Sequence, residues 1–199
     1  MILTGAALQC DRGGRTVFRD VSFRLKAGEL MQLTGPNGSG KSSLLRLIAG
    51  LNDAASGCLD LDGGSADLSI GQQAHYIAHQ EAVKTALTVR ENLLFWRGFL
   101  GGGDVDLALS AFDLQRFATF QAGLLSAGQK RRLALARLVL VPRVLWLLDE
   151  PTVGLDTASL ERLVRVMAAH LHVGGMIIAA THVPLGREAD TRLSLGAAG

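Results

Sequence analysis

The sequence predicts an α/β fold built around a parallel sheet, and three observations predict it. Residues 144–148 and 176–180 form unbroken apolar runs, which are typical of strands buried on both faces of a parallel sheet. An apolar run at residues 30–34 is followed by a glycine-rich loop and then by a helical pattern. Strand-like and helix-like segments follow one another along the chain in an order that indicates an α/β protein.

Composition supports a single folded domain over residues 1–199. Apolar residues make up 48% of the chain and charged residues 19%, so a substantial core is expected and general disorder is excluded. The formal net charge is +2, from 20 Lys and Arg against 18 Asp and Glu. This balance argues against a protein that mainly coats nucleic acid. The 24 glycines follow no period, which excludes collagen and repeat architectures.

Targeting signals and cysteines indicate a reduced, cytosolic setting. No apolar run approaches the ~20 residues that a membrane-spanning helix needs, and the N-terminus has neither the basic start nor the apolar stretch of a secretory signal. Cys10 and Cys58 are far apart and lack the spacing of metal ligands. We expect both cysteines to be reduced and buried as small apolar residues.

The N-terminal part is predicted to form an antiparallel β subdomain followed by the start of the α/β core. The strands expected there and in the following region are residues 2–9, 16–18, 21–25, 30–34, 58–61 and 75–78, with a turn at residues 11–14. Residues 42–51 carry leucine and isoleucine at helical spacing. A strand, a glycine loop and a helix therefore follow one another between residues 30 and 51.

A mainly helical subdomain is predicted at about residues 85–140, inserted into the α/β core. Apolar residues recur at helical spacing in three groups within residues 88–140, and glycines 101–103 separate the first two groups. A further helix is expected over residues 156–172, with Asp156 as its N-cap. After the strand at residues 176–181, the chain is expected to form one short strand at most.

The glycine-rich loop matches the phosphate-loop pattern. Its residues are Gly35, Pro36, Asn37, Gly38, Ser39, Gly40, Lys41 and Ser42, followed by Ser43. Glycines let backbone amides converge on an anion, and the start of the next helix adds partial positive charge. Lys41 is expected to neutralise the β- and γ-phosphates, and Ser42 to ligate Mg²⁺. The alternative is a glycine-rich hairpin turn, which the preceding strand and following helix disfavour.

Two carboxylates follow the apolar strand at residues 144–148. Asp149 is expected at the carboxyl end of this strand, where open parallel sheets bind ligands, and would hold Mg²⁺ through a water. Glu150 comes next and would orient and deprotonate the attacking water. The alternative is an acidic turn after a core strand, which becomes less favoured once the phosphate loop is considered.

A third motif covers residues 125–129, which we call the signature segment. Ser126 is a candidate N-cap for the following helix, and Gly128 permits a close backbone approach. A serine hydroxyl beside helix-start amides would make a second anion site. A capped helix with a basic face explains the same residues equally well, so the residues alone leave both interpretations open.

Taken together, these motifs resemble the ATP-binding-cassette ATPases, over about residues 2–195. The resemblance implies a P-loop NTPase with a RecA-like core, the two subdomains described above, and hydrolysis of ATP with Mg²⁺. It also implies a homodimer in which Ser126, Gly128 and Gln129 of one subunit contact the ATP of the other. Ala127 departs from the glycine of many members but leaves Ser126 and Gly128 in place.

The resemblance assigns further roles by position. Gln80 would contact Mg²⁺ or the lytic water, and His182 would contact the γ-phosphate. Residues 154–156 would meet the opposite subunit. Arg12 stands where many members have an aromatic residue that stacks on adenine. A guanidinium also stacks on bases, so adenine recognition is expected to be looser than phosphate recognition.

A narrower group of residues is similar to the ATP-binding subunits of cytochrome c maturation complexes, also described as haem exporters. These residues are His79, Gln80, Lys84, Thr85, Leu87, Thr88, Glu91, Asn92, Leu93, residues 125–138 and residues 181–185, together with Arg12. The similarity implies a separate integral-membrane permease, CcmB-like, at the cytoplasmic face of the inner membrane. It does not identify the transported substrate.

Two classes of function compete at this point. The first is an ATPase bound to a membrane permease, in cytochrome c biogenesis or in another small bacterial exporter. The second is a soluble cassette ATPase acting on nucleic acid or ribosomes, which the near-neutral charge and lack of a long insertion disfavour. For the first class, residues 87–100 with Phe95, Trp96 and Phe99 are the candidate docking surface. Alternatively, these aromatic residues fill the core of the helical subdomain.

Overall fold

The computed structural model describes residues 1–183 and 185–196. Its strands and helices are β1 Ile2–Arg12, β2 Arg15–Lys26, β3 Leu30–Thr34, α1 Lys41–Ile48, β4 Ser56–Asp62, β5 Ala74–Ile77, α2 Val89–Leu100, α3 Val105–Ala111, α4 Ala127–Leu140, β6 Leu145–Asp149, α5 Thr157–His172, β7 Met176–Ala180 and β8 Thr191–Ser194. Short 3₁₀ turns at Gly71–Gln73, Gln115–Phe117 and Ala122–Leu124 lie in the connections. The predicted strands and helices are confirmed, with ends that differ by a few residues.

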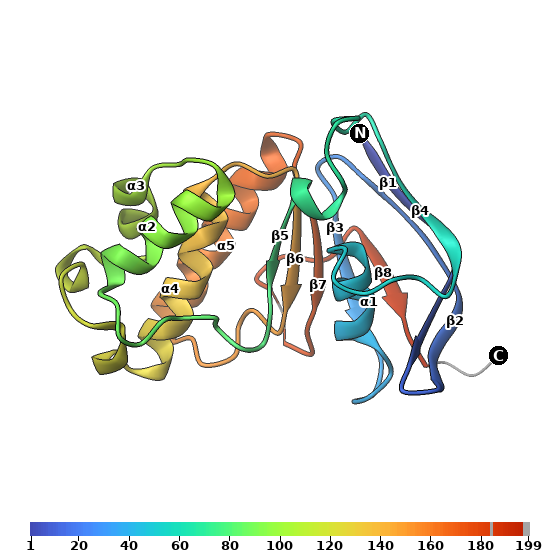
Figure 1. The fold of residues 1–199 in the computed structure, drawn as a ribbon, viewed down its shortest axis with the longest axis horizontal. Helices are drawn as coiled ribbons and strands as arrows, with labels where there is room; N and C mark the ends of the chain where they lie inside the picture. Colours follow the sequence, from blue (N-terminus) through green and yellow to red (C-terminus); the bar gives the residue numbers. More distant parts are fainter. Residues whose placement is uncertain (184, 197–199) are drawn as a thin grey trace.

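The central sheet is parallel, with strand order β5-β6-β7-β3-β8 (Figure 1). In this sheet Ala180 of β7 pairs with Asp149 of β6 on one side and with Leu33 of β3 on the other. The carboxyl ends of β3 and β6 therefore lie at the same level of the sheet. Ligand sites of open α/β sheets lie at this edge, because the loops that follow the strands meet there.

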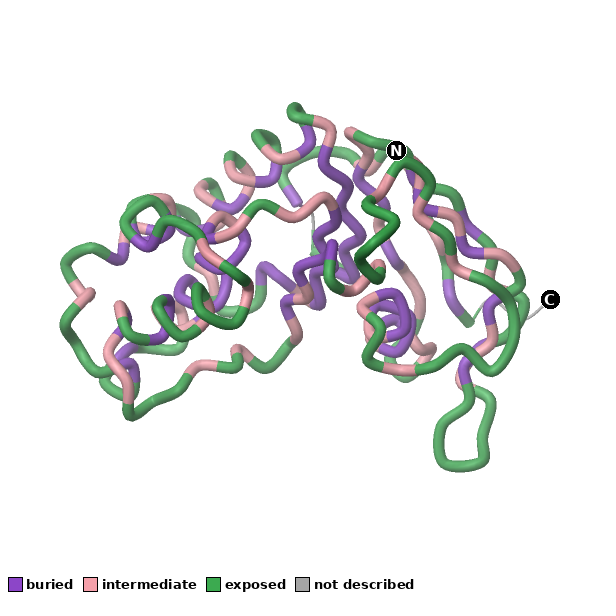
Figure 2. Tube along the Cα trace, turned by 45° about the horizontal axis from the view of Figure 1, so that its top comes forward, coloured by how far each residue is buried: buried purple, intermediate pink, exposed green. Residues whose placement is uncertain are grey.

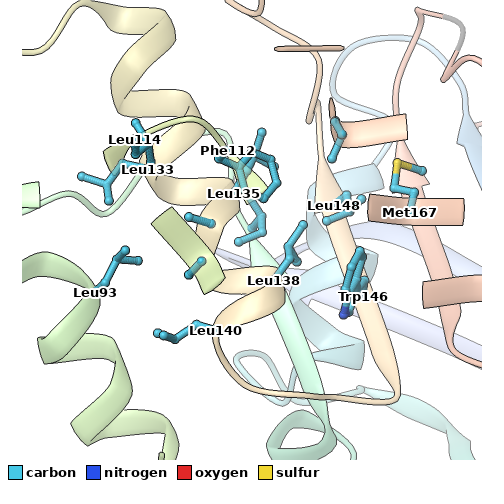
Figure 3. Packing of buried hydrophobic residues seen from close by; sticks show 14 of the residues in the cluster. Leu93, Phe112, Leu114, Leu133, Leu135, Leu138, Leu140, Trp146, Leu148 and Met167 are labelled. Carbon is cyan, nitrogen blue, oxygen red and sulfur yellow. The ribbon is translucent and has the colours of Figure 1, made fainter. Parts of the chain in front are cut away.

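Side chains from both faces of this sheet are buried, which explains the unbroken apolar runs. In β6, Trp146 and Leu148 pack toward the helical layer, and Figure 3 shows them beside Leu135 and Leu138 of α4. Leu145 and Leu147 alternate with them and pack toward α1 and the N-terminal strands. The two layers cover the sheet so completely that β6 and β7 are buried throughout (Figure 2).

The N-terminal strands form a separate antiparallel sheet with order β2-β1-β4. This sheet and α1 lie on one side of the parallel sheet, as predicted for an N-terminal β subdomain (Figure 1). Cys10 is buried in it as expected, but the prediction for Cys58 is wrong because that residue is exposed. Cys58 lies in β4, an edge strand whose side chains are mostly exposed, so a small apolar side chain there is not drawn into a core.

Helices α2, α3 and α4 come between β5 and β6 in the chain and lie with α5 on the opposite side of the parallel sheet (Figure 1). A capping box starts α2, in which Thr88 accepts a hydrogen bond from the Glu91 amide and the Glu91 carboxylate accepts one from the Thr88 amide. Gly101 ends α2 with a left-handed φ of 88°. Asp156 caps α5, as predicted.

Among residues 1–183 and 185–196, the structure has no helix with both the length and the apolar character needed to cross a membrane.

Candidate active site

The phosphate loop connects β3 to α1 in a conformation that requires glycine. Gly35, Gly38 and Gly40 have φ values of 135°, 83° and 99°, in the region that side chains rarely adopt. A Cβ on Gly35 would collide with the Leu195 carbonyl oxygen, and a Cβ on Gly40 would lie 2.8 Å from a Val17 methyl carbon. The loop therefore keeps its backbone exposed to a ligand only with glycine at these positions.

The amides of this loop remain available to an anion. Helix α1 begins after Gly40 with no side chain capping its first turn. The backbone N–H groups of Gly38, Gly40 and Lys41 have no acceptor among the described residues. Lys41 is buried, and its Nζ donates to the carbonyl oxygens of Gly35 at 2.7 Å and Pro36 at 3.0 Å. A fixed cation therefore lies beside the uncapped helix start, as a phosphate site needs.

The end of β6 brings two carboxylates to the same edge. Asp149 is 5% exposed, while Glu150 is the first residue beyond the strand and is partly exposed. Glu150 has a left-handed φ of 48°, and its amide donates to the Ala180 carbonyl at 2.8 Å. His182 Nε2 lies 3.9 Å from a Glu150 carboxylate oxygen. The loops after β6 and β7 therefore place an acid and a histidine next to each other.

One pocket of about 520 Å³ joins the loop to the carboxylates. It is lined by Arg12, Val17, Asn37, Gly38, Gly40, Lys41, Ser42, Ser43, His79, Asp149 and Glu150. Its donor set fits Mg²⁺, because a serine hydroxyl and a carboxylate are oxygen ligands and this ion takes its remaining ligands from phosphates and water. Cations from Arg12 and Lys41 complement the phosphates of a nucleotide.

Gln80 is not brought into this pocket. Its side chain is exposed, and the preceding residue, His79, lines the pocket instead. The predicted contact between Gln80 and the metal or water therefore remains a prediction. His79 is a lining residue that the sequence reasoning did not select, although its position directly before Gln80 was a usable signal.

The signature segment lies at the start of α4, away from the phosphate loop. Ser126 and Gln129 form a capping box, in which the serine hydroxyl accepts from the Gln129 amide at 3.3 Å and the Gln129 side chain accepts from the Ser126 amide at 2.8 Å. The predicted N-cap is confirmed. None of these residues lines the 520 Å³ pocket, because α4 and α1 pack against opposite faces of the parallel sheet.

Tyr76, in β5, lies close enough to Asp149 for the two groups to interact electrostatically. Burial raises the pKa of Tyr76, and the Asp149 carboxylate adds to this rise while Arg46 opposes it. The Arg46 Nε donates to the Tyr76 hydroxyl at 3.4 Å. The phenol therefore stays protonated at neutral pH. Spacing in the sequence did not predict this proximity of Tyr76 and Asp149, since it depends on the pairing of β5 with β6.

An uncapped glycine loop at a helix start, a buried lysine and an aspartate at the neighbouring strand end define a P-loop nucleotide-binding protein. A family model described as "ABC transporter" matches residues 18–153. The chain belongs to the ABC transporter family, and within it the chain is an ATP-hydrolysing subunit.

Relatives and solved structures agree with this assignment. The chain is 52% identical over 200 residues to "Cytochrome c biogenesis ATP-binding export protein CcmA" of Rhodopseudomonas palustris (strain BisB5), covering 100% of both chains. It is also 52% identical over 202 residues to the protein of the same name from Mesorhizobium japonicum, again covering 100% of both. The fold matches "Structure of ATP binding subunit of ABC transporter" with a TM-score of 0.87 at 24% identity, over 98% of this chain and 86% of that chain.

Proposed function

We propose that this chain is the ATP-hydrolysing subunit of a membrane export complex that serves c-type cytochrome biogenesis. One observation carries the proposal: about half of all residues are identical, from end to end, to proteins named for that process. These names favour a transport complex over a soluble cassette acting on nucleic acid or ribosomes. We place the chain at the cytoplasmic face of the inner membrane, held there by a separate CcmB-like permease.

The pocket residues divide the chemistry of ATP hydrolysis among them. Lys41 and the loop amides hold the β- and γ-phosphates, and Arg12 offers a guanidinium for stacking on the base. Ser42 and Asp149 would hold Mg²⁺, which when bound neutralises charge on the phosphates. Glu150 orients the attacking water and accepts its proton, while His182 contacts the γ-phosphate from the next strand.

A second copy of the chain completes each site. Helix α4 packs on the opposite face of the sheet from α1, so one chain directs its phosphate loop and its signature segment to different places. In a two-fold dimer, Ser126 and Gly128 of each subunit close over the γ-phosphate bound by the other. ATP then bridges the subunits, and its hydrolysis removes the bridge. This provides the two-state change that a transporter uses.

A groove beside α2 is the proposed docking surface for the permease. Its volume is about 640 Å³, and it lies between Trp96, Phe99 and Leu100 of α2 and the residues that follow α1 and precede β5. Phe95 is 43% exposed and Phe99 73% exposed, so these two rings do not fill the core of the helical subdomain. Trp96 is partly buried and packs against that core.

Charge around the groove indicates the chemistry of the docking segment. Arg137 and Arg143 line the groove, and no acidic residue is among its lining residues. The Arg137 guanidinium lies 4.0 Å from the centre of the Trp96 ring. A permease segment that combines apolar side chains with a carboxylate therefore fits this surface.

Co-purification from membranes tests the proposal. We expect the chain to be recovered from solubilised membranes with an integral-membrane permease, and c-type cytochromes to be lost from cells without the chain. Phe99→Glu should release the chain from membranes, while Val173→Glu, at an exposed apolar residue just beyond α5, should not. Recovery of the wild-type chain only in a soluble pool with RNA, or normal cytochrome content in cells without it, would contradict the proposal.

A further inference from the structure

A single buried arginine of α4 connects two segments of the candidate active site, one after β5 and one at the end of β6. Arg131 lies in the second turn of α4 and is 2% exposed. Its guanidinium donates to the carbonyl oxygens of Ala78 at 2.9 Å, Asp149 at 3.1 Å and Glu150 at 2.7 Å, and its Nε donates to Pro151 at 3.4 Å. Arginine suits this position, because its planar group holds several donors in one fixed arrangement.

The carbonyls that Arg131 holds belong to the segments that carry the chemistry. Ala78 directly precedes His79, which lines the pocket. Glu150, the proposed catalytic base, has a left-handed backbone, which costs about 1–2 kcal/mol for a residue with a side chain. The surrounding structure must therefore hold it in place. Three hydrogen bonds do so: the Ala180 carbonyl accepts from its amide, the Val153 amide donates to its carbonyl at 3.3 Å, and Arg131 donates to the same carbonyl at 2.7 Å.

The signature segment lies at the N-terminal end of α4, the helix that carries Arg131. Ser126 caps α4, and Arg131 follows within two turns, so the two move together with a rigid helix. Contact with the loop after Glu150 reinforces this coupling, because a Cβ on Gly128 would lie 2.9 Å from the Gly154 carbonyl oxygen. A displacement of the signature segment is therefore transmitted to the backbone of Glu150.

We propose that Arg131 is a positioning residue that couples the two ATP sites of the dimer. The inference rests on the proposed function, in which the signature segment of one subunit contacts the ATP held by the other. Arg131 then relates the state of that partner site to the position of Glu150 in its own subunit. Each site becomes fully active only when both contain ATP, so hydrolysis depends cooperatively on ATP concentration.

The test is the rate of ATP hydrolysis as a function of ATP concentration for Arg131→Gln. We expect the wild-type chain to give a Hill coefficient above about 1.5, and the variant a value near 1. The kcat should fall roughly tenfold to hundredfold, because the catalytic carboxylate is displaced by a fraction of an ångström. ATP affinity, measured in the Glu150→Gln background, should change less than about twofold, since Arg131 does not line the pocket.

Arg132→Gln is the matched control. Arg132 is the next residue and is 8% exposed, but it donates to the carbonyls of Phe112 and Asp113 within the helical layer. It should lower stability to a similar degree while keeping the Hill coefficient. Equal loss of cooperativity in both variants would show that any loosening of the helical layer suffices, and would overturn the inference.

A second variant keeps the test decisive if Arg131→Gln does not fold. Arg131→Lys retains the charge, but one ammonium cannot span the carbonyls of both segments, so we expect the same loss of cooperativity. Full recovery of kcat and of the Hill coefficient by lysine would overturn the inference. A cooperative wild type with a cooperative Arg131→Gln refutes this inference alone, whereas a wild type that neither hydrolyses ATP nor dimerises refutes the proposed function.

Discussion

The starts of α1 and α4 are the two helix starts assigned to nucleotide binding, and they differ because only the start of α1 is left uncapped. Helix α1 follows Gly40 and has no side-chain hydrogen bond capping its first turn, and the Lys41 ammonium is held beside it. Helix α4 follows Ser126, whose hydroxyl already accepts from the Gln129 amide. The difference shows that α1 is built to hold an anion alone, whereas α4 is stable without one. This difference supports the proposal that the signature segment provides a second contact to a phosphate already held by another subunit.

The largest expected effect comes from removing the cation at the first helix start. Lys41→Ala should lower ATP hydrolysis by at least about a hundredfold, because the amides of α1 then face the phosphates without a neutralising charge. ATP turnover in solution measures this effect. Lys26→Ala, an exposed lysine at the end of β2, removes the same charge and should leave turnover unchanged. Normal turnover by Lys41→Ala would remove the basis for assigning the loop to phosphate.

An effect of comparable size on hydrolysis, but not on binding, is expected from the loss of the proposed base. Glu150→Gln should slow hydrolysis by roughly 10²–10³-fold while ATP still binds, because the amide cannot accept a proton from water. Single-turnover hydrolysis and equilibrium binding separate the two effects. Glu161→Gln, on the exposed side of α5, is the control and should retain full activity. If Glu150→Gln lost binding and hydrolysis together, the carboxylate would be acting on the nucleotide itself.

A smaller effect on ATP turnover is expected from Ser126→Ala, and it distinguishes the start of α4 from a helix start with a purely structural cap. Ser126→Ala and Thr88→Ala remove the serine and threonine of two equivalent capping boxes, on α4 and α2. Each should reduce the free energy of unfolding by about 1 kcal/mol. Only Ser126→Ala should also reduce ATP turnover, by roughly tenfold, which corresponds to one lost hydrogen bond to phosphate. Equal turnover in the two variants would mean that Ser126 is a cap and nothing more.

The smallest effect on activity is expected from a change in the parallel sheet that separates α1 from α4, at His75 of β5. Burial lowers the pKa of His75 in β5 to about 4, although the hydrogen bond to the Val141 carbonyl acts to raise this pKa. Because the unfolded chain takes up this proton near pH 6.5 and the folded chain does not, stability falls as the pH drops from about 6.5 to 4. At about pH 4, the buried His75 has lowered the free energy of unfolding by about 3 kcal/mol relative to neutral pH.

Urea unfolding at several pH values measures this dependence. His75→Gln should flatten it between pH 6.5 and 4 and should leave ATP turnover at pH 7.5 within about twofold. His172→Gln, at the exposed end of α5, is the matched control and should keep the wild-type slope. An unchanged slope in His75→Gln would show that other groups produce the acid sensitivity. His170, whose pKa burial also lowers to about 4, is the first of these to test.

Sequence reasoning succeeded where function depends on short spacings. The phosphate loop, the acidic pair after β6 and the caps Ser126 and Asp156 are local patterns, and the structure places each as predicted. It failed at Cys58, because exposure depends on which strand forms the edge of the sheet. It assigned no individual role to His79 or Arg131, because the packing of α4 against β5 and β6 is what brings Arg131 to the carbonyls beside His79 and Glu150.

The structure describes only part of residues 181–185, the segment that contributed to the family resemblance and contains His182. The buried Thr181 holds the turn through its hydroxyl, which accepts from the Val183 amide at 3.0 Å and sets the backbone next to His182. Pro184, which contributed to the family resemblance, lies outside the described residues. A lone histidine after a strand gave no geometric signal by itself, since its proximity to Glu150 follows from the pairing of β6 with β7.

The mass of Glu150→Gln in solution with ATP and Mg²⁺ tests the central claim most directly. If the two helix starts form one site across a dimer, this variant should change from the 21.0 kDa monomer to twice that mass when ATP is added. Adding Ser126→Arg to it should return the monomer without weakening ATP binding by more than about threefold. A chain that binds ATP and stays at 21.0 kDa, or one that dimerises equally well with Ser126→Arg, would contradict the account.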